Sequence, residues 1–263
     1  MFRALHTAAS GMLAQQMDLD NIANNLANAS TNGFRRRRLE FQDLLYQNLV
    51  VPGSAATQQT TVASGLEIGL GTRPASTELV QSQGDLDTTN NPLDLAIQGS
   101  GFFQIKMPSG EMAYTRAGSF HLDAQGGIVD ADGNQLQPQI SVPLNATHIS
   151  IGSDGTVSAT IPGQTNAQLI GTITLATFPN SGGLESAGQN LFYPTTASGQ
   201  AIIGNPGGAE GLGQLQQGAL EESNVNVVDE FIQMITAQRS YEANSRVVKA
   251  ADQMFQDLNN LAQ

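Results

Sequence analysis

The side chains that could carry out catalysis are scattered along this chain of 263 residues. The three histidines, His6, His121 and His148, lie far apart, and none has a second histidine four residues away, as a zinc-binding helix requires. The chain has no cysteine, which excludes disulfides, thiolate metal sites and cysteine nucleophiles. It also lacks a G-x-S-x-G nucleophile elbow and the G-K-[ST] ending of a phosphate-binding loop. These patterns indicate neither a catalytic centre nor a cofactor.

The acidic residues do not indicate a metal site or a catalytic site either. Asp130, Asp132 and Asn134 alternate like the first ligands of a calcium loop, but the glycine after the third ligand and the closing glutamate are missing. Asp85 and Asp87 could form a carboxylate pair, yet alternate residues of any strand share one face. We therefore predict no catalytic, cofactor-binding or metal-binding residues, and a protein that is not an enzyme.

Composition narrows the class of partner. The net charge is −12 and the pI about 4.4, which argues against nucleic acid or an anionic membrane as the main partner. No run approaches the 18 or so apolar residues of a membrane span, so no membrane insertion is expected. After Arg3 the sequence has no continuous apolar segment typical of a signal peptide. We expect that, if the protein is exported, its N-terminus is retained.

Two long helices are predicted, one at each end of the chain. The first, within residues 1–33, carries an apolar heptad and is expected to end at Asn32-Gly33, where glycine tolerates a left-handed backbone. The second runs from Val227 to Ala262 with an apolar residue at every seventh position, and its other seam positions are mostly polar apart from Phe231. The first seam comprises Leu5, Ala8, Met12, Gln15, Leu19, Ile22 and Leu26, and the second comprises Val227, Met234, Tyr241, Val248, Phe255 and Ala262. A seam this polar suits a helix that touches several neighbours.

The chain between the helices has two characters. Residues 34–83 form an extended insert or linker, within which Leu39 to Leu49 could make a short helix and residues 51–65 a turn-rich loop. Residues 84–221 show short alternating strands with glycine turns, among them the hairpin signal Asp154-Gly155, and predict an all-β domain. The fold class is therefore α+β: terminal helices (1–33 and 222–263) forming a coiled-coil-like unit, with an inserted all-β domain.

Four consecutive arginines, Arg35, Arg36, Arg37 and Arg38, stand out against the acidic background. They could simply face water in a turn after the helix. They could instead contact acidic side chains of another subunit, for which Glu221, Glu222, Asp229 and Glu230 are the candidates because they lie where the second helix begins.

Three motifs carry a resemblance to a known family. They are AASGMLAQQMDLDNIANNLANASTNGF near the N-terminus, GLEIGLGTRP with QGDLDTTNNPLDLAIQGSGFFQI and YTRAGSFHLD in the centre, and GALEESNVNVVDEFIQMITAQRSYEANSRVVKAADQM near the C-terminus. In this order they resemble the rod and hook axial proteins of the bacterial flagellum. ASTNGF and RRRR depart from the forms most usual in that family.

The resemblance implies a structural subunit of the distal rod in the flagellar basal body. Such a subunit is exported by the flagellar type III apparatus and polymerises helically into a hollow shaft across the periplasm that transmits torque to the hook. The implied partners are further copies of itself, proximal rod and hook-side axial proteins, the peptidoglycan-level and outer-membrane rings, and the export apparatus. The expected assembly interface comprises Leu5, Met12, Leu19, Ile22, Leu26, Arg35, Arg36, Arg37, Arg38, Val227, Phe231, Met234, Tyr241, Val248 and Phe255.

The sequence leaves other functions open. A proximal rod or hook protein shares the fold and differs in the GLEIGLGTRP motif and in length. A rod-associated cell-wall hydrolase is disfavoured by the missing zinc-ligand and acid-pair motifs. A monomeric adhesin would need neither heptad helix.

Overall fold

The computed structural model describes residues 2–53, 63–163, 167–208 and 211–261. The chain divides into two compact units, and each unit is built from stretches that are not contiguous in the sequence. The helical unit comprises residues 1–26, 37–78 and 226–263, and the β unit comprises residues 27–36 and 79–225. Ala262 and much of the turn-rich loop at 51–65 lie outside the described residues.

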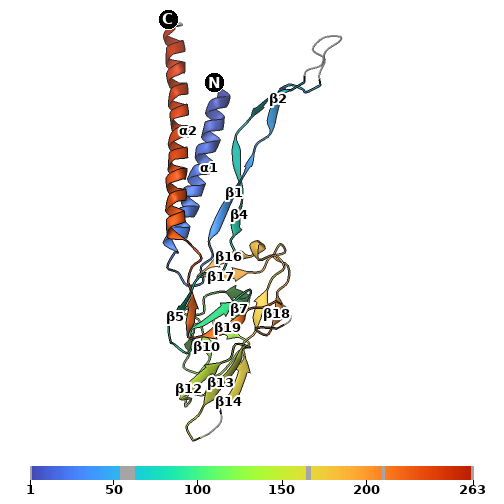
Figure 1. Cartoon of the computed structure of the whole chain (residues 1–263), viewed down its shortest axis with the longest axis vertical. Helices are drawn as coiled ribbons and strands as arrows, with labels where there is room; N and C mark the ends of the chain where they lie inside the picture. Colours follow the sequence, from blue (N-terminus) through green and yellow to red (C-terminus); the bar gives the residue numbers. More distant parts are fainter. Residues whose placement is uncertain (1, 54–62, 164–166, 209–210, 262–263) are drawn as a thin grey trace. The chain divides into compact units, whose positions relative to one another are not determined.

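The helical unit contains two antiparallel helices, α1 (Phe2–Ala27) and α2 (Val227–Leu261) (Figure 1). The Phe2 ring centroid lies 5.3 Å from that of Phe255, and the Asn25 side-chain nitrogen donates to a Glu230 carboxylate oxygen at 3.4 Å. The start of α1 therefore lies beside the end of α2, and the end of α1 beside the start of α2. The α+β fold class is confirmed.

The end of α1 differs from the prediction. The helix stops at Ala27 rather than Asn32-Gly33, and the next residues form turns in which Thr31 donates its backbone N–H to the Asn28 carbonyl at 3.1 Å. Asparagine and threonine side chains compete with helical hydrogen bonds, which explains the early stop. Gly33 does adopt a left-handed φ of +70°, but its N–H donates to the Glu221 carbonyl at 2.7 Å within the β unit.

The beginning of α2 follows from its capping residues. Asn226 accepts hydrogen bonds through its side-chain oxygen from the backbone N–H groups of Val228 at 3.0 Å and Asp229 at 3.4 Å. These bonds satisfy donors that have no partner inside the first helical turn. Asp229 and Glu230 also place negative charge near the positive end of the helix dipole.

Most of the described residues between 37 and 79 form strands, so the helix predicted from Leu39 to Leu49 is wrong. Its strands are β1 (Arg37–Asp43), β2 (Tyr46–Val50), β3 (Leu66–Gly69) and β4 (Thr72–Leu79). Strand β1 pairs with β4 and β2 with β3, which makes one long interrupted hairpin, called the arm below (Figure 1). Backbone pairing between strands that are distant in the sequence, such as Tyr46 with Gly69, decides the structure here.

The β unit contains a nine-stranded sheet in the order β16-β17-β8-β7-β11-β10-β9, with β15 joining β7 to β18. A three-stranded sheet β12-β13-β14 and the pairs β19-β6 and β20-β5 complete it. Its strands are β5 (Leu86–Thr88), β6 (Leu95–Gln98), β7 (Phe102–Lys106), β8 (Met112–Thr115), β9 (His121–Leu122), β10 (Ile128–Val129), β11 (Gln135–Gln137), β12 (His148–Ile151), β13 (Thr156–Thr160), β14 (Gln168–Thr172), β15 (Leu175–Thr177), β16 (Glu185–Gly188), β17 (Leu191–Tyr193), β18 (Ile202–Gly204), β19 (Gln214–Gln217) and β20 (Ala219–Glu221).

The core of the β unit follows from this pairing. Inward residues of neighbouring strands, such as Phe103, Ile105 and Leu136, are fully buried in one apolar cluster. Phe103 packs edge-on against Phe120, with ring centroids 5.1 Å apart. The hairpin predicted at Asp154-Gly155 is confirmed, because β12 and β13 pair across it.

Candidate assembly surfaces

The apolar seam predicted on α1 lies on the packed side of that helix. All seven of its residues are half-buried or buried, and Ile22 is the least accessible, at 1% exposure. The alternating three- and four-residue spacing therefore located the packed face of α1 correctly.

The phase of the α2 seam is different from the prediction. The prediction took the second seam position to lie four residues after each residue of the series Val227, Met234, Tyr241 and Val248. In the structure the packed residues lie three positions after each of them. These are Glu230, Ala237, Asn244 and Ala251, of which Glu230, Ala237 and Ala251 are buried. Phe231, which we assigned to the seam, is instead 48% exposed. Small side chains on this face allow close approach: a Cβ added at Gly11 of α1 would lie 2.8 Å from the Asn244 amide.

A polar contact joins α1 to both of its neighbours within the helical unit. The Asn25 side chain bonds both backbone groups of Arg37, donating to its carbonyl at 2.9 Å and accepting from its N–H at 3.0 Å. Asn21 donates to the same carbonyl at 2.9 Å. Asn25 also reaches Glu230 of α2, as described above, and both residues are buried. Buried amides with so few possible partners favour one helix register over its alternatives.

The outer side of α2 carries an exposed apolar surface over its first turns. Val228, Phe231, Ile232 and Ile235 follow helical spacing of three and four, and each is between 48% and 65% exposed. This spacing gathers them on the face opposite Glu230 and Ala237. We call these four residues the α2 ridge. Large apolar side chains grouped in this way mark a surface for association.

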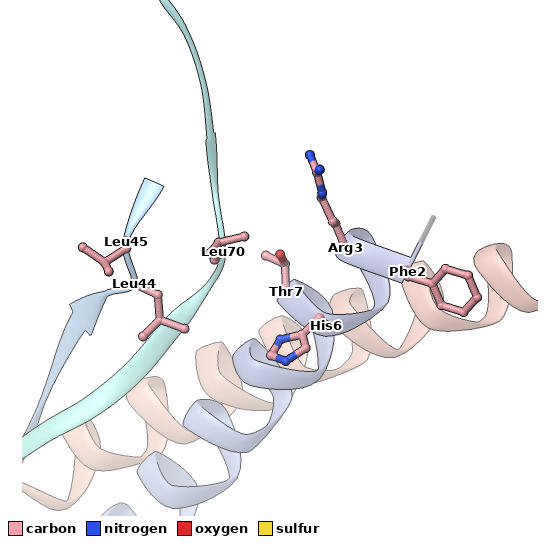
Figure 2. A pocket seen from close by; sticks show the side chains of 7 residues that line it. All are labelled: Phe2, Arg3, His6, Thr7, Leu44, Leu45 and Leu70. Carbon is pink, nitrogen blue, oxygen red and sulfur yellow. The ribbon is translucent and has the colours of Figure 1, made fainter. Parts of the chain in front are cut away.

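A second apolar surface, a hollow of about 510 Å³, lies at the beginning of α1. Figure 2 shows its lining, with α1 on one side and the arm on the other. Leu44 and Leu45 lie between β1 and β2, and Leu70 lies between β3 and β4. The full lining is Phe2, Arg3, His6, Thr7, Leu44, Leu45 and Leu70.

A glycine holds the arm against α1 beside the hollow. Gly71 has φ +114°, and a Cβ added there would lie 2.2 Å from the Ser10 hydroxyl oxygen. Its carbonyl accepts from the Leu44 N–H at 2.9 Å, which ties the two sides of the arm together at the interruption. Only a residue without a side chain fits this position.

We expect Gly71→Ala to move the arm away from α1, because alanine at this φ is strained and its methyl group overlaps Ser10. Hydrogen exchange at residues 66–79 should increase, and the chain should lose roughly 1–3 kcal/mol of stability. Gly69→Ala is the matched control, since its Cβ would meet only the edge of the Tyr46 ring at 3.4 Å. Equal exchange in both variants would contradict this role of Gly71.

The arginine run is divided between the two units, and Arg35 does not behave as predicted. Arg35 is 2% exposed, and its Nη2 lies 2.7 Å from Glu221 Oε1 within the same chain. The predicted contact of Arg35 with Glu221 of another subunit is therefore wrong. Arg38, on β1, is exposed and pairs across the arm with Glu78 of β4.

Glu221 is the centre of a buried charge cluster in the β unit. Besides Arg35, it faces Arg116, whose Nη1 lies 3.5 Å from Glu221 Oε2, and it accepts from the Gly84 N–H at 3.1 Å. Burial lowers the pKa of Arg116 to about 10, a shift that the Glu221 carboxylate opposes. Burial likewise lowers the pKa of Arg35, again opposed by Glu221. One carboxylate thus offsets two desolvated guanidinium groups.

Asn224 strengthens the same region by joining three chain segments. Its side-chain oxygen accepts from the Arg36 N–H at 2.7 Å, and its amide nitrogen donates to the carbonyls of Val80 at 3.0 Å and Ser82 at 2.9 Å. Our reading of the sequence missed Arg116 and Asn224. Both lie in the motifs YTRAGSF and EESN, but neither spacing nor periodicity distinguishes them there.

Comparison with known proteins agrees with the order of the three motifs. Three family profiles match the chain: "Flagella basal body rod protein" at residues 5–35, "Flagellar hook protein FlgE/F/G D1 domain" at 96–159 and "Flagellar basal body rod FlgEFG protein C-terminal" at 216–261. The FlgG rod protein of Caulobacter vibrioides is 49% identical over 98% of this chain and 99% of its own length. The FlgG of Bacillus subtilis is 40% identical over 99% of both chains. This chain belongs to the FlgG family of flagellar basal-body rod proteins.

Within the FlgG family, the match covers both units of the chain. Arg35, Arg116 and Glu221, which meet in the buried cluster, each fall in a different matched span. The FlgE hook protein of Treponema pallidum is 40% identical, but over only 62% of this chain and 35% of the hook protein.

The described residues include no candidate metal-binding group and no helix that could span a membrane. No group of three or more histidine, aspartate and glutamate side chains among them could hold a metal ion. Asp130 accepts the backbone N–H groups of Asp132 at 3.0 Å and Asn134 at 2.8 Å, so this acidic loop stabilises a turn. Neither helix in the described part of the chain is long and apolar enough to cross a membrane.

Proposed function

We propose that this chain is a structural subunit of the distal part of the flagellar rod, and that it polymerises helically into a hollow shaft that transmits torque from motor to hook. The observation that carries the proposal is the alignment with FlgG rod proteins over nearly the whole of both chains. The partial match to a hook protein makes a hook subunit the second candidate, but that match leaves most of the hook protein uncovered.

The surfaces of the helical unit support a role in assembly. A helix that completes its packing within one chain has no need of four large apolar side chains on its outer face, as the α2 ridge has. The remaining predicted interface residues divide into two groups. Leu5, Met12, Leu19, Ile22 and Leu26 of α1, with Met234, Val248 and Phe255 of α2 and also Arg36 and Arg37, are buried or half-buried in the chain, whereas Val227 and Tyr241 are exposed.

The proposal includes the location and the partners. The subunit is exported through the flagellar apparatus without cleavage of a signal peptide, lies in the rod across the periplasm, and turns inside the peptidoglycan-level and outer-membrane rings. Proximal rod and hook-side proteins contact the two ends of its polymer. The basal-body rod name of the relatives, and the rod and hook profiles that match this chain, support this placement.

Two experiments test the proposed function. Electron microscopy of the concentrated protein should show filaments with a central channel. A strain without its distal rod gene should regain swimming and hook-bearing basal bodies when it expresses this chain. Failure of both would contradict a rod subunit. Turbidity loss of a peptidoglycan suspension treated with the pure chain would instead favour a hydrolase.

We expect Phe231→Asp to abolish filament formation while leaving the monomer folded. Phe231 is 48% exposed in the chain, so a carboxylate costs little there, but burial of that charge between subunits costs several kcal/mol. Sedimentation of polymer measures the loss, and circular dichroism checks the fold. Gln233→Asp, at an exposed position on the other side of α2 from the ridge, is the matched control and should polymerise normally. Normal polymerisation of Phe231→Asp would remove the ridge from the interface.

A further inference from the structure

Building on the proposed function, we infer that the α2 ridge of one copy docks into the hollow at the start of α1 and the arm of the next copy. The two surfaces are an apolar projection and an apolar recess on the same helical unit. The occupant of the hollow is therefore a second copy of this chain, and specifically the first turns of its α2.

The hollow has the chemistry to receive apolar side chains. Leucines form its arm side, and Leu45 is 86% exposed in the isolated chain, which is costly for a large apolar side chain in water. Phe2 adds an exposed ring at the other end. A volume of about 510 Å³ can accommodate several apolar side chains of the ridge.

A pair of opposite charges favours one orientation of the ridge in the hollow. Arg3 is exposed and belongs to the lining of the hollow, and Figure 2 shows its side chain projecting outward from α1. Asp229 is exposed and lies beside the ridge, three residues before Ile232. Docking that buries the ridge can place Asp229 of one copy near Arg3 of the next. In a chain of net charge −12, such a local attraction offsets repulsion between copies.

The position of the two surfaces determines the kind of assembly. The hollow includes Phe2, which packs against Phe255 near the end of α2, whereas the ridge occupies the beginning of α2. Ile232 and Phe255 are 23 residues apart, or about 35 Å along a helix. A ridge therefore cannot fill the hollow of its own helical unit. When a copy fills the hollow of one neighbour and receives the ridge of another, the contact is heterologous, and its repetition builds a filament wherever the rotation between copies does not close a ring.

Disulfide cross-linking tests the contact directly, because the chain contains no cysteine of its own. A Leu45→Cys/Ile232→Cys double variant should form filaments that oxidation, or a short bifunctional maleimide, converts into a covalent ladder on a denaturing gel. A mixture of the Leu45→Cys and Ile232→Cys single variants should give cross-linked dimers and no larger products. The matched Leu45→Cys/Gln233→Cys variant should give no ladder, because helical spacing places the exposed Gln233 on the other side of α2 from the ridge.

Charge exchange provides the second test. Arg3→Asp alone and Asp229→Arg alone should each weaken polymerisation about tenfold at low salt, and high salt should narrow the gap to the original chain. The double variant, with both charges exchanged, should recover most of the lost polymerisation.

The outcomes separate the docking from the proposed function. Filaments that form without a ladder, with no recovery in the charge-exchanged variant, would overturn the docking and leave the rod function standing. Absence of filaments from the original chain, together with failure to restore swimming, would overturn the rod function and the docking with it. A ladder that appears equally with Gln233→Cys would also overturn the assignment of the ridge.

Discussion

Replacement of Glu221 by alanine is expected to lower the free energy of unfolding of the β unit by about 3–5 kcal/mol, because it leaves two buried guanidinium groups without a counter-charge. Glu221 is 1% exposed, and Arg35 and Arg116 both lie within 4 Å of its carboxylate. The Gly84 N–H also loses its acceptor. Chemical denaturation, followed by hydrogen exchange in the β unit, measures the effect.

The neighbouring glutamate offers a matched control. Glu222 is exposed, and its only described bond runs from its backbone N–H to the Asp85 carbonyl, which alanine preserves. Glu222→Ala should change stability by no more than about 0.5 kcal/mol. Similar denaturation midpoints for the two variants would contradict a central role for Glu221. Removing the charge of Arg116 as well, by Arg116→Met, should recover part of the loss in Glu221→Ala.

The local features of this fold could be predicted from the sequence. The packed face of α1 follows from its heptad, the start of α2 from the change of pattern before Val227, and the β12–β13 hairpin from Asp154-Gly155. In each case the deciding interactions lie within a few residues of one another. Periodicity and turn chemistry report such interactions directly.

Features that depend on distant residues could not be predicted in this way. The apolar run Leu39–Leu49 fits a helix or two strands equally well, and only pairing with residues 66–79 makes it the arm. Arg35 meets a glutamate 186 positions later, so the four arginines looked like a single surface cluster. In folded form they serve at least two purposes: Arg35 is internal, and Arg38 pairs within the arm.

The phase of α2 was missed for a different physical reason. The prediction placed Phe231 on the seam, yet the face that meets α1 carries Ala237 and Asn244 because the helices approach closely there. The large side chains Phe231 and Ile232 are left outside. In an assembling protein the most apolar face of a helix can belong to the intermolecular contact, so hydrophobicity alone does not identify the intramolecular one.

This distinction leads to an opposite expectation for a charge placed on the inner face. Ile22→Asp is expected to destabilise the helical unit of the monomer itself, by about 4 kcal/mol or more. Ile22 is 1% exposed, so the substitution loses the burial of an isoleucine, worth about 2–5 kcal/mol, and also desolvates a carboxylate. Helical circular dichroism should fall, and trypsin should cleave α2 rapidly after Arg239 and Arg246 while the β unit stays protected.

The neighbouring position provides the control, and Phe231→Asp provides the contrast. Ala23 is exposed, so Ala23→Asp should cost less than about 1 kcal/mol, the loss of helix propensity alone. Both Ile22→Asp and Phe231→Asp should fail to polymerise, but only Ile22→Asp should lose helix content and trypsin resistance as a monomer, because only Ile22 packs within the chain. If trypsin cleaves α2 equally fast in the Ile22→Asp and Phe231→Asp monomers, the two faces of the helical unit do not have the separate roles argued here.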